Sequence, residues 1–157
     1  MTDLVRGGRR VLVFSAHAAD FCSRAGGTIA RLTEAGSEVH VVDFSYGERC
    51  ESPALWARQP SPSLVDVKEA RAAEIEAAVA VLGATWECLD YGDSPLIVGP
   101  ERQQEVLRIF RRRQPDLVRR AADVARPSAR RGGPHGLRHG CPTFCRIVAV
   151  AGVPTDL

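Results

Sequence analysis

Apolar runs alternate with stretches of helical periodicity along most of the chain. Residues 11–16 form an uninterrupted apolar run, and residues 38–45 form a second run rich in β-branched side chains. Between them, residues 28–34 carry apolar side chains at helical spacing and stop before Gly36, a residue suited to end a helix. Strand, helix and strand in this order predict a parallel βαβ unit with a right-handed crossover.

The same alternation continues toward the C-terminus. The further predicted elements are a helix over residues 63–82, a strand at 86–89, a helix over 101–113 and a strand that starts at 115, with loops at 17–27, 46–62 and 90–100. This order predicts an α/β fold, a Rossmann-like open parallel sheet with helices on both faces. In such sheets ligands bind beyond the C-terminal ends of the strands.

The last 39 residues have a different composition. Residues 119–157 hold seven basic and two acidic residues, five Gly and four Pro, with no Glu, no Lys and no sustained periodicity. We therefore divide the chain into an α/β domain at residues 1–118 and an irregular basic tail at residues 119–157. Because the change is abrupt, we expect the tail to be a truncated or frame-altered remnant.

Length and composition restrict the class of protein. A chain of 157 residues supports one core, and it contains no apolar run long enough to span a bilayer and no secretory signal in residues 1–10. We therefore expect a soluble, cytoplasmic protein without a membrane partner. Five cysteines without a CxxC pair indicate neither a disulfide framework nor a structural zinc cluster. A nucleic-acid arm is the weaker interpretation of the basic tail, and homo-oligomerisation stays open.

Candidate chemistry follows the first two predicted strands. His17 and Asp20 follow the first strand, and imidazole and carboxylate suit a catalytic zinc, which takes three protein ligands and a water molecule. A loop histidine bonded to a nearby aspartate is the alternative. Glu48 follows the second strand and can serve as a general base or be a solvated side chain. Arg24 and Arg49 flank the same edge and suit carboxylate recognition, although surface arginines are often only solvated.

Three segments resemble a known family. FSAHAADF, RAGGTIARL and VVDFSYGERCESPALW are similar in order and spacing to the PIG-L/LmbE-like zinc proteins, over about residues 10–118. Deacetylases of N-acetylglucosaminyl groups in that superfamily carry A-H-P-D-D, which implies that His17 and Asp20 hold zinc. Their general base is the first Asp of this motif, and here Ala19 replaces it. A deacetylase or another amide hydrolase is therefore an alternative that needs a different base.

One branch of the superfamily is more similar. The motifs S-A-H-x-A-D-F and S-Y-G-E-R-x-E-S-x-x-L-W resemble the 4-oxalomesaconate hydratases of gallate and protocatechuate breakdown. This resemblance implies that zinc-activated water adds across the C=C of an oxo-tricarboxylate, a small-molecule carboxylate substrate. It implies Glu48 as the catalytic residue that moves the proton, and substrate binding by Tyr46, Arg24 and Arg49.

The third zinc ligand falls in the tail. The superfamily carries D-P-x-N-x-D-H-P, whose His is a ligand, and G-P-H-G-L-R-H can be laid over that motif with His139 at the ligand position. The resemblance thus implies Zn²⁺ on His17, Asp20 and His139, with His135 as the weaker candidate. Arg138 replaces the Asp of the motif, so an incomplete, inactive copy and a non-catalytic binding module remain alternatives.

Overall fold

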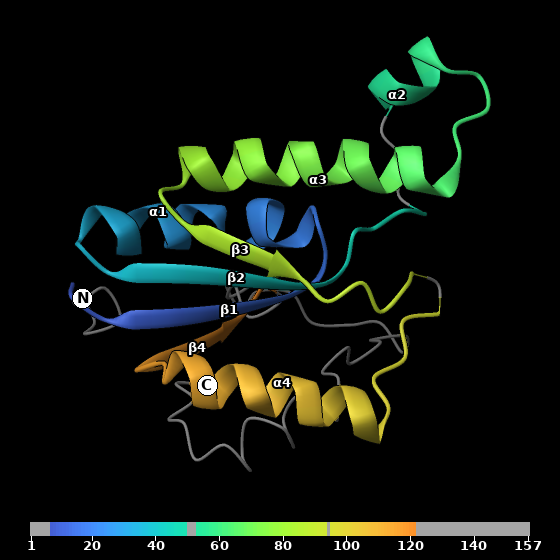
Figure 1. The fold of residues 1–157 in the computed structure, drawn as a ribbon. Helices are drawn as coiled ribbons and strands as arrows, with labels where there is room; N and C mark the ends of the chain where they lie inside the picture. Colours follow the sequence, from blue (N-terminus) through green and yellow to red (C-terminus); the bar gives the residue numbers. More distant parts are fainter. Residues whose placement is uncertain (1–6, 50–52, 94, 122–157) are drawn as a thin grey trace, which may run out of the picture.

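The computed structural model describes residues 7–49, 53–93 and 95–121. Its strands form one parallel sheet in the order β3-β2-β1-β4 (Figure 1). The elements are β1 (Arg10–His17), the π-helical turn η2 (Phe21–Ala25), α1 (Gly26–Glu34), β2 (Glu38–Ser45), α2 (Pro53–Arg58), α3 (Leu64–Val81), β3 (Thr85–Cys88), α4 (Pro100–Arg113) and β4 (Leu117–Arg120).

The two central strands, β1 and β2, are covered on both faces. Side chains alternate along a strand, so Val11 and Val13 of β1 face one side of the sheet while Leu12 and Phe14 face the other, and all four are almost fully buried. The first pair packs in a cluster with α1 and α3, and the second pair packs with α4. Figure 1 shows α1 and α3 on one face and α4 on the opposite face. The predicted α/β fold is confirmed.

Two segments expected to be loops contain helices. Residues 21–25 form the π-helical turn η2, which runs directly into α1. Phe21 is fully buried and Ala25 is 6% exposed, so burial of these two side chains stabilises a helical turn that local propensity does not favour. Residues 53–58 form α2, and the proline at its first position has the backbone angle that suits a helix start.

The ends of α3 follow from local chemistry. Ser63 and Asp66 form a reciprocal capping box at its N-terminus, in which the Ser63 hydroxyl accepts from the Asp66 N–H and the Asp66 carboxylate accepts from the Ser63 N–H. At the other end Gly83 adopts a φ of 65°, which a side chain would strain. The observed helix matches the predicted one within a residue at each end.

Strand β4 crosses the predicted domain boundary at residue 118. Strand β4 ends at Arg120, two residues past position 118, and Ala121 is still buried. His135, His139 and the rest of the predicted tail lie outside the described residues, so the division at residue 118 stays a prediction. Among the described residues, no helix combines the length and the apolarity needed to cross a membrane.

Candidate active site

The C-terminal edge of the sheet brings the two predicted loops together. His17 is the last residue of β1 and pairs in register with Ser45, the last residue of β2. Because the strands are parallel, the segment after Ser45 and the loop after β3 emerge at the same edge. This is the edge at which ligands bind in open α/β sheets.

His17 lies between two carboxylates. Its Nδ1 atom is 3.4 Å from Oδ2 of Asp20, and its Nε2 atom is 3.0 Å from Oδ1 of Asp93. The Asp20 hydrogen bond, together with the charges of both carboxylates, holds the pKa of His17 above its ordinary value despite the opposing effect of burial. In turn, the His17 hydrogen bond holds the pKa of Asp20 below its ordinary value. The two side chains therefore favour a positive charge between His17 Nδ1 and the Asp20 carboxylate, either a proton or a metal ion.

The spacing of this pair fits two ligands of one zinc ion. Two ligand atoms that each stand about 2.0–2.2 Å from a tetrahedral zinc are roughly 3.3–3.6 Å apart. The distance of 3.4 Å between His17 Nδ1 and Asp20 Oδ2 falls in this range and is long for a charge-assisted hydrogen bond. Asp93 holds the other ring nitrogen, as carboxylates commonly do behind a zinc-bound histidine. The residues present therefore fit two ligands and their support.

A complete ligand set does not appear within the described residues. In residues 7–49, 53–93 and 95–121, no group of three His, Cys, Asp or Glu side chains is arranged to hold a metal ion. The third predicted ligand, His139, lies outside this part of the chain.

The segment after β2 lies against His17. Gly47 has a φ of 68°, and a Cβ atom built at this position would stand 3.3 Å from the Cβ of His17. The N–H of Gly47 donates to the Ser45 hydroxyl, which donates to the Ala16 carbonyl. A residue without a side chain therefore lets this segment approach the candidate ligand closely.

Glu48 and Arg49 are placed differently. Glu48 is buried, and its Oε2 atom has no hydrogen-bond partner among the described residues. Arg49 is exposed at the side chain, but its backbone N–H donates to Oδ2 of Asp93 at 3.1 Å. Asp93 thus joins the His17 ring to the backbone of the segment that carries Glu48.

The other two predicted substrate-binding residues have structural contacts of their own. Nε of Arg24 is 3.2 Å from Oδ1 of Asp20, so this guanidinium orients the carboxylate that faces His17. The ring of Tyr46 packs edge-on against Trp86, with its centroid 5.9 Å from the Lys68 ammonium, and burial raises the pKa of the phenol. Their binding of a substrate stays a prediction.

Two acidic residues near His17 were not identified from the sequence. Asp93 lies on the loop after β3, and the rule that pointed to the first two loops points to this one as well. Asp43 lies within the apolar run of β2 and is fully buried. Its pKa is raised to about 7, mainly by burial, with the Asp20 charge contributing to the rise and with Ser15, His17 and Arg71 opposing it. The sequence carried one signal for this residue, because an aspartate within a strand that helices cover on both faces has to be buried.

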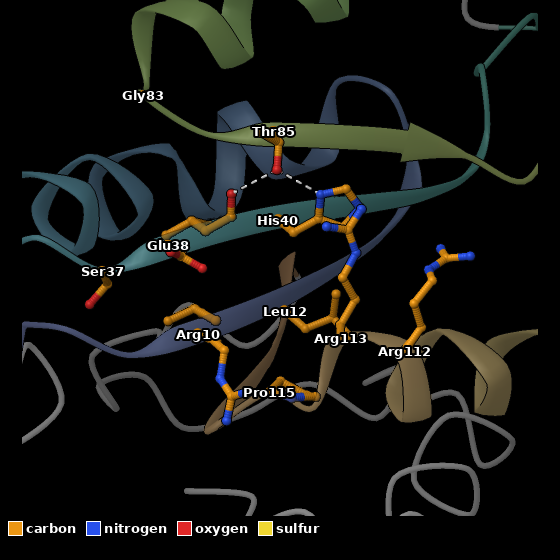
Figure 2. Close-up of a pocket in the computed structure, with 12 residues that line it drawn as sticks. Arg10, Leu12, Ser37, Glu38, His40, Gly83, Thr85, Arg112, Arg113 and Pro115 are labelled. Atoms are coloured by element: carbon orange, nitrogen blue, oxygen red, sulfur yellow. Dashed lines mark hydrogen bonds between the residues drawn. The ribbon is translucent and has the colours of Figure 1, made fainter.

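A groove of about 520 Å³ opens at the opposite edge of the sheet (Figure 2). His40 Nδ1 lies 2.7 Å from Thr85 Oγ1, and its Nε2 lies 3.0 Å from both Arg113 Nη2 and Glu87 Oε1. Burial holds the pKa of His40 below its ordinary value, although the hydrogen bond with Glu87 opposes this shift. The carboxylate of Glu87 accepts two hydrogen bonds from Arg112. These contacts give His40 a structural role at this edge of the sheet.

Comparisons with known proteins agree with the resemblance in the sequence. A 4-oxalmesaconate hydratase of Pseudomonas putida is 44% identical over 110 residues, which are 70% of this chain and 42% of the relative. The crystal structure of GalB, the 4-carboxy-2-hydroxymuconate hydratase of Pseudomonas putida KT2440, superposes with a TM-score of 0.65 at 43% identity, over 71% of this chain and 46% of that one. The chain thus spans less than half the length of these relatives.

A deacetylase has a similar structure at lower identity. The N,N'-diacetylchitobiose deacetylase of Pyrococcus horikoshii superposes with a TM-score of 0.63 at 29% identity, over 70% of this chain and 39% of that one. A model of the PIG-L family, described as GlcNAc-PI de-N-acetylase, matches residues 12–126. This match begins within β1 and covers every later described element and more than two thirds of the sequence, so the chain belongs to the PIG-L family.

Proposed function

We propose that this protein is a zinc-dependent hydratase that adds water to the C=C of an oxo-tricarboxylate such as 4-oxalomesaconate. The observation that carries the proposal is the geometry of His17, whose Nδ1 faces Asp20 at ligand spacing while Asp93 holds Nε2. Two hydratases are similar to 70% and 71% of the chain, and the PIG-L family match over residues 12–126 includes all three residues. We place the reaction in the cytoplasmic breakdown of aromatic acids such as gallate.

His17 and Asp20 would hold the zinc ion together with a third ligand, for which we propose His139. Bound zinc supplies Lewis-acid activation of water. Asp93 keeps the His17 ring in one orientation and one tautomer, since it accepts from Nε2–H and leaves Nδ1 toward Asp20. Arg24 orients Asp20 from the opposite oxygen.

Glu48 would move the proton. Hydration forms a C–O bond at one alkene carbon and a C–H bond at its neighbour, so water supplies both the hydroxyl group and the proton. A carboxylate that accepts the water proton and returns it to carbon completes this balance. Glu48 is buried, with one oxygen that has no partner among the described residues, which suits a group that accepts a proton at a water-poor site.

The charges around the proposed centre and the similarity to hydratases support an oxo-tricarboxylate substrate. Three carboxylates need cationic partners, and a guanidinium binds a carboxylate with two parallel hydrogen bonds. Arg49 presents an exposed side chain beside Asp93, and Arg24 lies beside Asp20, so both border the proposed centre. Tyr46 follows β2 at the same edge and would contribute its hydroxyl group.

Deacetylation is the second candidate because the family description and the chitobiose deacetylase favour it. Ala19 argues against it, since an alanine cannot take the proton that the first Asp of A-H-P-D-D takes in the resembling deacetylases. A non-catalytic module or an inactive copy would give no turnover of either substrate.

The test is turnover of 4-oxalomesaconate by the full chain supplied with zinc, followed by loss of the ultraviolet absorbance of the conjugated C=C. We expect hydration by the wild type, and a rate lower by about 100-fold or more for Glu48→Gln. Glu69→Gln on the exposed surface of α3 is the matched control and should keep the wild-type rate. Release of acetate from N,N'-diacetylchitobiose without hydration would support the deacetylase instead, and the absence of both reactions would overturn the proposal.

A further inference from the structure

Asp43 is a buried carboxylate to which the described residues donate no hydrogen bond. It lies near the end of β2, paired in register with Ser15 of β1 and Cys88 of β3, and its exposed fraction is zero. Neither carboxylate oxygen accepts a hydrogen bond from the residues that the structure describes. The neighbouring Ser15 hydroxyl donates instead to the His17 carbonyl, at 2.7 Å. A charged carboxylate in such surroundings is strongly unfavourable unless a positive charge compensates it.

The cationic side chains around Asp43 are engaged with other groups. His17 and Arg71 both act electrostatically on Asp43. The His17 ring is held by Asp20 and Asp93 through its two nitrogens. The Arg71 guanidinium donates to the Tyr46 carbonyl and to the carboxylate of Glu74. The charge of Asp43 is therefore left without a dedicated partner in the described part of the chain.

Two carboxylates contact His17, and Arg24 pairs with one of them. Asp20 and Asp93 contact the ring, and Asp20 adds to the electrostatic cost of ionising Asp43. This arrangement favours a divalent cation at the spacing between His17 Nδ1 and Asp20. Asp43 pairs in register with Ser15, two residues before His17 on the same face of β1, so its charge would act on such a cation at short range.

We propose that Asp43 is a buried counter-charge that strengthens the binding of a divalent metal ion at His17 and Asp20 without being a ligand. This inference rests on the proposed metal centre. The charge of Asp43 then has two effects. It destabilises the fold when no metal is bound, and it attracts the metal ion whose charge compensates it. Asp43 thus differs in its role from the ligands and from Glu48, because it acts on the bound ion only through its charge.

Zinc affinity tests the inference on the full chain. We expect Asp43→Asn to bind zinc about 10-fold more weakly than the wild type at pH 8, in competition with a chromophoric chelator, as for other partners beyond the ligand shell. Asp43→Thr, which suits a strand, provides a second variant if the amide folds poorly. Asp116→Asn makes the same change of charge at the opposite edge of the sheet and should bind zinc as the wild type does.

Thermal unfolding supplies the second readout. Without metal, Asp43→Asn should unfold at a higher temperature than the wild type, and saturating zinc should shrink or reverse that difference. Equal zinc affinity of the wild type and both Asp43 variants would overturn the role of Asp43 alone. A wild type that binds no zinc would overturn the metal centre and this inference together. A weakened affinity in a protein that hydrates no substrate would support the inference and overturn the proposed function.

Discussion

The Nε2 atom of His17 lies 3.0 Å from Oδ1 of Asp93, which joins the end of β1 to the loop after β3, on the far side of β2 in the sheet. The Asp93 side chain is 5% exposed, so water competes little for this contact. Its second oxygen accepts the backbone N–H of Arg49. One buried carboxylate thus fixes the position of the candidate ligand His17 relative to the segment that carries the candidate base Glu48.

Replacing Asp93 should weaken metal binding. The two oxygens of Asp93 accept hydrogen bonds from His17 Nε2 and from the Arg49 backbone N–H. An asparagine has a single side-chain oxygen, so in Asp93→Asn one of these two groups loses its acceptor. We expect zinc affinity to fall by about 10- to 100-fold, measured by competition with a chelator. Asp90→Asn removes an exposed carboxylate of the same loop that pairs with Lys68, and it should leave the affinity unchanged. Equal effects of both substitutions would refute the specific role of Asp93.

Gly47→Ala should disturb the site as well as the fold. The positive φ strains any side chain by about 1–2 kcal/mol, and the new Cβ would stand 3.3 Å from the Cβ of His17. Gly36→Ala is the control, because Gly36 also has a positive φ and has open space around it. Both variants should lose stability in urea unfolding, and only Gly47→Ala should also lose hydratase activity. A loss of activity in Gly36→Ala would show that stability alone explains the effect.

The stability of the protein should depend on His40 below neutral pH. Burial lowers the pKa of His40 in the fold from 6.5, so the unfolded chain binds more protons as the pH falls below 6.5. The stabilising contribution of the neutral ring is therefore present above that pH and is lost at lower pH. We expect the difference in unfolding free energy between the wild type and His40→Gln to shrink between pH 7 and pH 5. A difference that is constant over this range would contradict a lowered pKa of His40 in the folded protein.

Asp43 should have the opposite pH dependence in the metal-free protein. Its pKa in the fold is about 7 and its ordinary value is 3.8, so the folded state binds more protons between these values. Stability is then lost as the pH rises from 4 to 7, by about 4 kcal/mol at most. Asp43→Asn should remove this loss, so the variant gains on the wild type with rising pH. Urea unfolding at pH 5 and pH 8 checks the prediction, and parallel profiles of the two proteins would contradict it.

Much of the fold could be predicted because its signals are local. The apolar run at residues 38–45 matches β2 residue for residue, and the capping box of Ser63 and Asp66 marks the start of α3. The turn at residues 21–25 could not be predicted, since its helical form depends on the burial of Phe21 against elements distant in the sequence. Local propensity carries no information about that burial.

The candidate site divides in the same way. His17, Asp20 and Glu48 could be identified from the sequence because each follows an apolar strand and lies in a motif that resembles a known family. Asp93 and Asp43 could not be assigned, because their importance depends on which strands are neighbours. The order β3-β2-β1-β4 brings the loop after β3 to His17 and encloses Asp43 between two strands.

The sequence by itself determined the class of fold, the family and the two candidate metal ligands, since periodicity and motif spacing are properties of the chain. The tertiary structure alone decided that Asp93 holds the His17 ring and that Asp43 is buried where the described residues donate no hydrogen bond to it. The physical reason is that hydrogen bonding and desolvation depend on the distances between side chains, and long-range packing sets those distances when parallel strands associate.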